Sequence, residues 1–327
     1  MTWWKRRGLS PEGWRPRWRE LAFLGLLLLG LQGCAPEAGP LVDLSERGVA
    51  PTLTAPPAGS PPVYTFSYDH RLEPTEDAQM YASLLDYLTG HTGFRFRLYV
   101  SHDSQDLVSG LESGRIDFAA VGALSYLQAE ARDGVRMLAV GRNSEGQSTY
   151  RAEIFARPDS PIQHVSDLRG KSFAFGSRTS TQGYLIPLIM MSEAGLRLQD
   201  LREYEHTGSH AECVDAVLSG QFDAGALQDT LAERLAAERS IRIVATSAAY
   251  PSSGIVAGTG VPPEIAERVR DALLTLDPQG KDGPNLYRWH DSEMPDGFAE
   301  ARPGEYEALR GWARQLGILD SGGGTQP

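Results

Sequence analysis

The stretch that decides the fold covers residues 171–184 and reads KSFAFGSRTSTQGY. Residues 171–175 have the pattern of a β-strand, and a helix is expected over 181–194. The turn between them is rich in hydroxyl side chains. The start of a helix carries partial positive charge and N–H groups without intrahelical acceptors, so this turn can hold a phosphate-like oxyanion without a lysine. An ordinary helix cap, which needs only one hydroxyl, is the alternative interpretation.

Strands and helices alternate on both sides of this stretch. Further strands are expected at 63–68, 94–100, 116–121, 137–140, 150–156, 223–227 and 241–245. Helices are expected from Thr75 to a stop at Gly90, at 107–114 and at 306–316, with two more that end at Gly220 and begin at Pro262. Alternation with short turns predicts an α/β protein with largely parallel sheets covered on both faces.

The pattern restarts near residue 150, which predicts two lobes with a ligand cleft between them. We expect lobe 1 to begin with residues 63–150, lobe 2 to comprise 151–247, and residues 248–319 to return to lobe 1 and form the C-terminal helices. Ligands of open α/β sheets bind outside the carboxyl ends of the strands. Functional residues are therefore expected in the loops that follow Phe66, Val121, Phe175 and Leu227.

The N-terminal segment has the composition of a targeting signal. A basic stretch is followed by an uncharged apolar run at 21–31, which as a helix of about 16 Å is too short for a bilayer core of about 30 Å. This predicts a signal peptide over 1–33. Its end, LQGC, resembles a bacterial lipobox, in which the cysteine, here Cys34, is lipidated. The proline-rich residues 34–62 are expected to be a flexible tether, and residues 320–327 a disordered tail.

Composition narrows the classes of partner. The formal net charge of −11 argues against nucleic acid. The two cysteines, Cys34 and Cys213, exclude a four-cysteine zinc site and make a disulfide framework unexpected. We expect a monomer without a cofactor.

Several short motifs occur in a familiar order: GRID at 114–117, Gly122 with Tyr126, DLRGK at 167–171, YLIP at 184–187, GSH at 208–210 and GQFDAG at 220–225. Together with the opening stretch they resemble the phosphate/phosphite/phosphonate-binding proteins of ABC importers. This family has the two-lobed type II periplasmic binding-protein fold. The resemblance covers residues 63–319.

The resemblance implies a set of ligand-binding residues. The hydroxyls and N–H groups at the helix start would hold the oxyanion, Tyr150 would face it from the hinge, and His210 would donate to it. Gln182 stands where the family often has serine, and Ser253 replaces an aspartate that would pair with a ligand ammonium, which argues against an aminoalkylphosphonate. The full set of candidates is Tyr68, Tyr126, Tyr150, Thr179, Ser180, Thr181, Gln182, Gly183, His210, Asp229 and Ser253.

The function implied is that of an extracytoplasmic lipoprotein that captures a phosphorus oxyanion and delivers it to an ABC permease in the inner membrane. A sensor that reports to a membrane histidine kinase or cyclase is the main alternative. A metal site built from His206, His210, Glu212 and Cys213 and a hydrolase that uses Ser180 with His210 are weaker alternatives.

Overall fold

The computed structural model describes residues 61–72, 74–131 and 134–319, which all fall within one compact unit. The predicted signal peptide 1–33, the lipidation site Cys34, the tether except for its last two residues, and the tail 320–327 lie outside the described residues. Among the described helices, none is long and apolar enough to span a bilayer.

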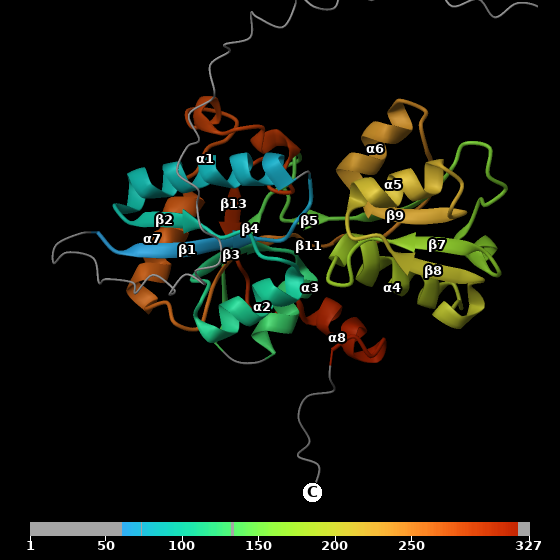
Figure 1. Cartoon of the computed structure of the whole chain (residues 1–327), viewed down its shortest axis with the longest axis horizontal. Coiled ribbons are helices and arrows are strands. Elements are labelled where there is room, and N and C mark those ends of the chain that lie inside the picture. The colour runs from blue at the N-terminus through green and yellow to red at the C-terminus, as the bar shows by residue number, and fades with distance from the viewer. Residues whose placement is uncertain (1–60, 73, 132–133, 320–327) are drawn as a thin grey trace, which may run out of the picture. The chain divides into compact units, whose positions relative to one another are not determined.

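The first lobe is built on a six-stranded sheet with the order β13-β4-β12-β3-β1-β2. Helices α1 and α7 cover one face and α2 and α3 the other (Figure 1). The strands are β1 (Val63–Tyr68), β2 (Arg95–Leu98), β3 (Phe118–Val121), β4 (Arg136–Gly141), β12 (Gly254–Ala257) and β13 (Phe298–Glu300). The helices are α1 (Pro74–Thr92), α2 (Ser104–Ser113), α3 (Ala123–Glu130) and α7 (Pro263–Leu274).

The second lobe is built on a five-stranded sheet with the order β10-β6-β9-β7-β8. Helices α5 and α6 lie on one face and α4 on the other (Figure 1). The strands are β6 (Ala152–Ala156), β7 (Ser172–Phe175), β8 (Glu203–His206), β9 (Ala224–Gln228) and β10 (Arg242–Thr246). The helices are α4 (Ile186–Glu193), α5 (His210–Leu218) and α6 (Asp229–Ala237).

Two short strands join the lobes. β5 (Thr149–Tyr150) and β11 (Tyr250–Pro251) pair antiparallel, with Tyr150 opposite Tyr250. The last helix, α8 (Glu307–Gln315), contributes Leu309 and Ala313 to an apolar cluster that also includes residues of both lobes. Short 3₁₀ turns occupy Val165–Leu168, Leu198–Asp200, Gly283–Asn285 and Trp289–Asp291.

The two-lobed α/β fold is confirmed, but the expected largely parallel sheets are wrong: both sheets are mixed. β12 runs antiparallel to β3 and β4, and β6 runs antiparallel to β9. Both strands enter their sheets directly after a crossing between the lobes. β6 and β12 therefore begin at the edge of the sheet where the parallel strands of that lobe end. For this reason each of them runs antiparallel to its neighbours β9, β3 or β4.

Two local predictions also need correction, and two helices were missed. Gly90 does not stop α1, which continues to Thr92 and ends before Gly93, whose φ of +72° provides the left-handed turn. The helix expected over 181–194 begins with one π-helical turn, Thr181–Leu185. Helices α3 and α6 were not predicted.

Candidate ligand-binding site

A small cavity lies where loops of both lobes meet, with a volume of about 40 Å³, enough for a few water molecules. The loops after β1, β3 and β7 supply most of its lining, as the sequence predicted. The loop after β9 does not reach it. The lining consists of Asp69, His70, Arg71, Ser104, Gly122, Tyr150, Ser177, Thr179, Ser180, Thr181, Gln182, His210, Ser253 and Glu293.

The hydroxyl-rich turn of the second lobe forms one wall. Ser180 is the helix N-cap, and its Oγ accepts a hydrogen bond from the N–H of Gly183 at 2.9 Å. Gly183 packs so closely that a β-carbon there would lie 3.1 Å from the α-carbon of Gly176. The cap and the π-helical turn hold the wall in place, and the first N–H groups of the turn have no intrahelical acceptors.

Thr181 connects the two lobes. Its Oγ1 accepts a hydrogen bond at 2.9 Å from the N–H of Leu124, in the first turn of α3. The N-cap of α3 is Gly122, which has no side chain, so a hydroxyl from the opposite lobe takes the place of a capping side chain. Since the oxygen accepts from Leu124, the hydroxyl proton of Thr181 stays free to donate to a ligand.

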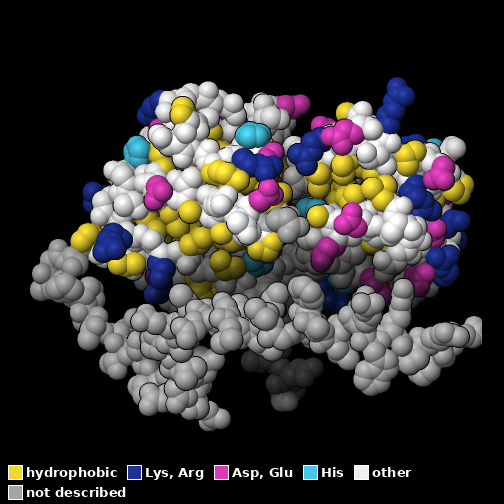
Figure 2. Space-filling model, turned by 45° about the horizontal axis from the view of Figure 1, so that its top comes forward, with side chains coloured by type: hydrophobic (Ala, Val, Ile, Leu, Met, Phe, Trp, Pro, Cys, Tyr) yellow, Lys and Arg dark blue, Asp and Glu magenta, His cyan; other side chains and the backbone are white. Residues whose placement is uncertain are grey.

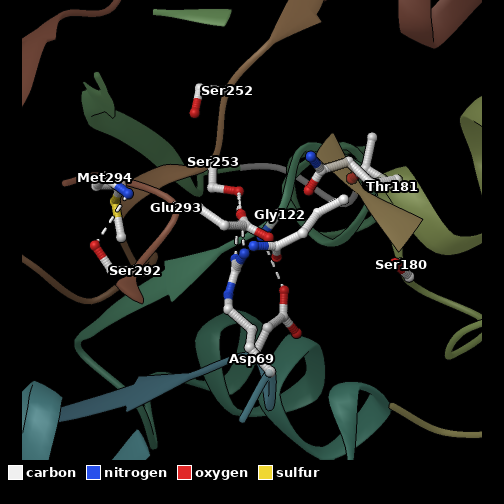
Figure 3. Close-up of polar contacts among 12 residues, drawn as sticks. Asp69, Gly122, Ser180, Thr181, Ser252, Ser253, Ser292, Glu293 and Met294 are labelled. Atoms are coloured by element: carbon white, nitrogen blue, oxygen red, sulfur yellow. Dashed lines mark hydrogen bonds and ion pairs between the residues drawn. The ribbon is translucent and has the colours of Figure 1, made fainter. Parts of the chain in front are cut away.

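The first lobe contributes a buried ion pair to the opposite wall. Arg71 forms a salt bridge with Glu293, and its Nη2 donates to Ser253 Oγ at 3.3 Å. Ser253 in turn donates to Glu293, and Figure 3 shows these two side chains pointing toward each other. The side chains of Arg71 and Glu293 are 12% and 8% exposed. The Arg71 Nε is buried and has no hydrogen-bond partner within the described residues.

A second carboxylate lies at the end of β1. Asp69 accepts a hydrogen bond through Oδ2 from the N–H of Gly122 at 2.9 Å, a contact visible in Figure 3. Its Oδ1 is buried and makes no hydrogen bond to the described residues. The cavity therefore offers an acceptor beside its donors, as a protonated oxyanion needs.

Tyr150 and His210 complete the site from the hinge and from α5. Burial raises the pKa of Tyr150, and its hydroxyl lies beside Thr181 and Ser253 without a well-formed hydrogen bond to either. His210 is 9% exposed and its Nδ1 has no partner among the described residues. Burial, and to a lesser degree the charge of Arg71, lower the pKa of His210 to about 4. His210 is thus a neutral hydrogen-bonding group at pH 7.

The chain is similar in sequence and fold to known proteins. Residues 66–306 match the family model described as the periplasmic substrate-binding protein of phosphonate ABC transporters. The chain belongs to this family.

Individual relatives are distant. The phosphate-import protein PhnD of Mycolicibacterium smegmatis is 24% identical over 207 residues, 58% of this chain; the chain spans 64% of that relative's length. PhnD1 of Prochlorococcus marinus, solved with methylphosphonate, superposes with a TM-score of 0.69 at 18% identity, over 79% of this chain and 99% of that one. XAC2383 of Xanthomonas citri, solved with chloride, gives 0.67 at 24% identity, over 78% and 99%. These superpositions establish the fold.

Seven of the candidates that the family resemblance suggested line the cavity: Tyr150, Thr179, Ser180, Thr181, Gln182, His210 and Ser253. Gly183 lies just behind it, with its N–H already bonded to Ser180. Tyr68 is fully buried and stacks on Tyr81 at 4.6 Å, on the side of the sheet covered by α1, and burial raises its pKa to about 12. Tyr126 donates to Glu130 at 2.6 Å. Neither tyrosine lines the cavity.

Gln182 and Asp229 both contact Arg151 at the hinge. Gln182 Nε2 donates to the backbone oxygen of Arg151 at 2.9 Å. Asp229 Oδ2 accepts from the backbone N–H of the same residue at 2.7 Å. Asp229 lies outside the cavity lining, and Gln182 reaches it while also fixing the residue that follows β5.

The sequence argument from Ser253 also changes. Ser253 replaces an aspartate that would pair with a ligand ammonium, and the loss of that charge was expected to disfavour an aminoalkylphosphonate. Glu293, from an irregular segment before β13, places its carboxylate next to Ser253 and accepts a hydrogen bond from the Ser253 hydroxyl. A carboxylate therefore lies at this place, where it is paired with Arg71.

Sequence reasoning did not name Asp69, Arg71 or Glu293. The first two belong to the loop after β1, which was expected to be functional but for which only Tyr68 was chosen. No local pattern marks Glu293, which reaches Ser253 across 40 residues of chain.

The proposed metal ligands do not converge. His206 ends β8, with its Nδ1 3.2 Å from the backbone oxygen of Gly176, whereas His210 begins α5. The thiol of Cys213 is buried and donates to Ala174 O at 3.3 Å. Over residues 61–72, 74–131 and 134–319 no group of three histidine, cysteine or acidic side chains is placed to bind a metal.

Proposed function

We propose that this protein captures a phosphorus oxyanion in the cavity between its lobes. The observation that carries the proposal is the hydroxyl-rich start of the π-helical turn, which faces the guanidinium of Arg71 across one small cavity. Thr179, Thr181, His210 and the N–H groups of the turn would donate from the second lobe, Arg71 from the first lobe and Tyr150 from the hinge. The names of the relatives, which include a phosphate importer and a methylphosphonate complex, support this ligand class.

Capture would be coupled to closure of the lobes. A ligand that touches both lobes binds the closed state more tightly and raises its population. The hydrogen bond from Leu124 to Thr181 shows how directly one wall of the site contacts the other lobe. We propose that the closed protein then docks on an ABC permease. The match to a transport family favours this role over the sensor alternative.

The site supports binding rather than catalysis. Ser180 Oγ accepts the hydrogen bond that caps its own helix, and no hydrogen bond links it to His210 within the described residues. At pH 7 His210 is neutral, yet no carboxylate is hydrogen-bonded to its ring to orient it as a base in the part of the chain described. We infer a monomeric binding protein without a cofactor.

The periplasm is the compartment of this family. We propose that residues 1–33 are a signal peptide and that lipid on Cys34 anchors the protein through a tether over 34–62. The lobe limits that we propose are 63–150 with 248–319, and 151–247. Mass spectrometry of the mature N-terminus would show whether Cys34 is diacylated.

Calorimetric titration with phosphate, phosphite, methylphosphonate and sulfate tests the ligand class. Binding at a thousand times Kd should add about 4 kcal/mol to the free energy of unfolding and raise Tm by several degrees. The variant Arg178→Gln should bind the same ligand as the wild type does, because Arg178 belongs to the hydroxyl-rich turn but does not line the cavity. If none of the phosphorus oxyanions binds to a folded sample, the proposal is wrong.

A further inference from the structure

Arg71 is the main cation at the oxyanion cavity. Of the described residues that line the cavity, it is the only lysine or arginine, whereas Asp69 and Glu293 each bring a carboxylate. A guanidinium suits an oxyanion well, because its N–H groups form paired, charge-assisted hydrogen bonds to neighbouring oxygens. The affinity of the cavity for an anion therefore depends on whether Arg71 is available to it.

Glu293 already occupies this guanidinium. It forms a salt bridge with Arg71, and Ser253 holds the pair together: the Ser253 Oγ accepts from Arg71 Nη2 at 3.3 Å and donates to Glu293. All three side chains line the cavity, and Figure 3 shows Ser253 and Glu293 pointing toward each other. The carboxylate of Glu293 thus makes the kind of contact with Arg71 that an oxyanion ligand would make.

The pair and a ligand would compete for the same charge. The side chains of Arg71 and Glu293 are largely withdrawn from water, and a desolvated charge is stable only while it keeps a partner. An oxyanion added beside the intact pair would place three negative groups, Asp69, Glu293 and the ligand, around one cation in a poorly solvated site. An oxyanion therefore gains Arg71 only if Glu293 gives it up.

A larger space beside the cavity has room for the displaced carboxylate. Its volume is about 420 Å³, and its lining includes Arg71, Pro295 two residues after Glu293, and Arg234 of α6. Arg234 contacts Asp291 at 3.9 Å, a long ion pair that leaves its guanidinium able to accept a further carboxylate. Figure 2, in which the side that carries α1 and α6 is turned forward, shows basic and acidic side chains close together between these elements.

We propose that Glu293 is an internal competitor for Arg71: an oxyanion binds by displacing the Glu293 carboxylate, which turns toward the space beside α6. Glu293 lies between the 3₁₀ turn Trp289–Asp291 and β13, so no hydrogen bond of a helix or strand has to break. This inference rests on the proposed function and goes beyond it, because it assigns to Glu293 the control of affinity. The site fills only at ligand concentrations that outcompete a carboxylate tethered next to Arg71.

A double-variant cycle tests the competition. In calorimetric titrations with methylphosphonate, Glu293→Gln should lower the Kd about tenfold or more, because Arg71 is then free for the ligand. In an Arg71→Gln background the same substitution should lower the Kd by about twofold at most. Glu300→Gln is the control for the loss of one negative charge, because Glu300 is exposed on β13 and outside the cavity. Its Kd should stay within about twofold of the wild-type value.

A crystal structure of the wild type with methylphosphonate gives a second readout that needs no variant. Arg71 should contact the ligand, and Glu293 should no longer contact Arg71. A retained salt bridge between Arg71 and Glu293 in that complex overturns the proposal, even if a variant in the cycle does not fold.

The outcomes separate the competition from oxyanion capture itself. An unchanged or raised Kd in Glu293→Gln overturns the competition and leaves capture standing. A gain of equal size in both backgrounds has the same meaning, since it reflects charge repulsion alone. Binding by Glu293→Gln but not by the wild type supports the competition. Failure of phosphate, phosphite and methylphosphonate to bind any folded variant overturns both proposals.

Discussion

Thr181→Val removes the hydroxyl that caps α3 and that we propose donates to the ligand, while nearly keeping the side-chain shape. The buried N–H of Leu124 then loses its acceptor at 2.9 Å, which should lower the free energy of unfolding by about 1–2 kcal/mol. The negatively charged ligand also loses the hydrogen bond that the Thr181 hydroxyl would donate to it. Hydrogen bonds to charged groups are worth about 1.5–3 kcal/mol, which corresponds to about a 10- to 150-fold rise in Kd.

Isothermal titration calorimetry with phosphate and methylphosphonate measures the Kd, and urea unfolding measures the stability. Thr181→Ser keeps the hydroxyl and should stay within about fivefold of the wild-type Kd. A valine variant that is destabilised but binds normally would mean that the hydroxyl only caps α3. Wild-type values for both quantities would refute the reasoning at each step.

Three further predictions concern charge. Glu293→Gln should lower the stability because Arg71 loses its buried partner, but should tighten oxyanion binding because a negative charge beside the cavity is removed. Calorimetry that shows weaker binding would contradict this. The pKa of His210 is about 4 in the folded protein and 6.5 ordinarily, so between these pH values the unfolded chain binds more protons than the folded protein. The free energy of unfolding should therefore rise by about 3 kcal/mol as the pH rises from 4 to 6.5. Urea unfolding across this range should show that His210→Gln lacks the rise. Glu153 has the opposite sign, because burial raises its pKa to about 7 and the folded protein keeps the proton. The contribution of Glu153 to the free energy of unfolding is therefore lost as the pH rises from 4.5 to 7. In Glu153→Gln this decrease in stability should be absent, and a variant whose stability depends on pH as the wild type's does would contradict the prediction.

The alternation of strands and helices predicted both lobes and the wall formed by residues 177–182, because these depend on local periodicity and on turn composition. The helix α3 gave no such signal. Ala123, Leu124, Ser125, Tyr126 and Leu127 are all buried, so no exposed face imposes a polar stripe on the sequence. The antiparallel entry of β6 and β12 was likewise invisible, since strand direction within a sheet is set by pairing between distant segments.

The sequence predicted the site residues only where one continuous segment supplies several of them. Tyr68 was a candidate from the family resemblance, but it points toward α1 and stacks on Tyr81, and the loop residues Asp69 and Arg71 reach the cavity instead. Glu293 owes its place to the fold of an irregular segment, and neither its spacing nor its neighbours mark it. Gln182 was interpreted as a ligand donor because its position matched a serine; it lines the cavity, and its longer side chain also reaches the hinge, which the sequence did not indicate.

Arg151 gives the pivot between the lobes a particular mechanical character. Its backbone oxygen and N–H are held by Gln182 and Asp229, and its guanidinium donates to the backbone oxygen of Ser247 on the other crossing at 2.7 Å. The wall that would bind the ligand and the joint that would bend are therefore linked through one residue. The stiffness of the hinge and the geometry of the binding site are therefore coupled. A shorter side chain at position 182 would change the rotation between the lobes as well as the ligand that the site binds.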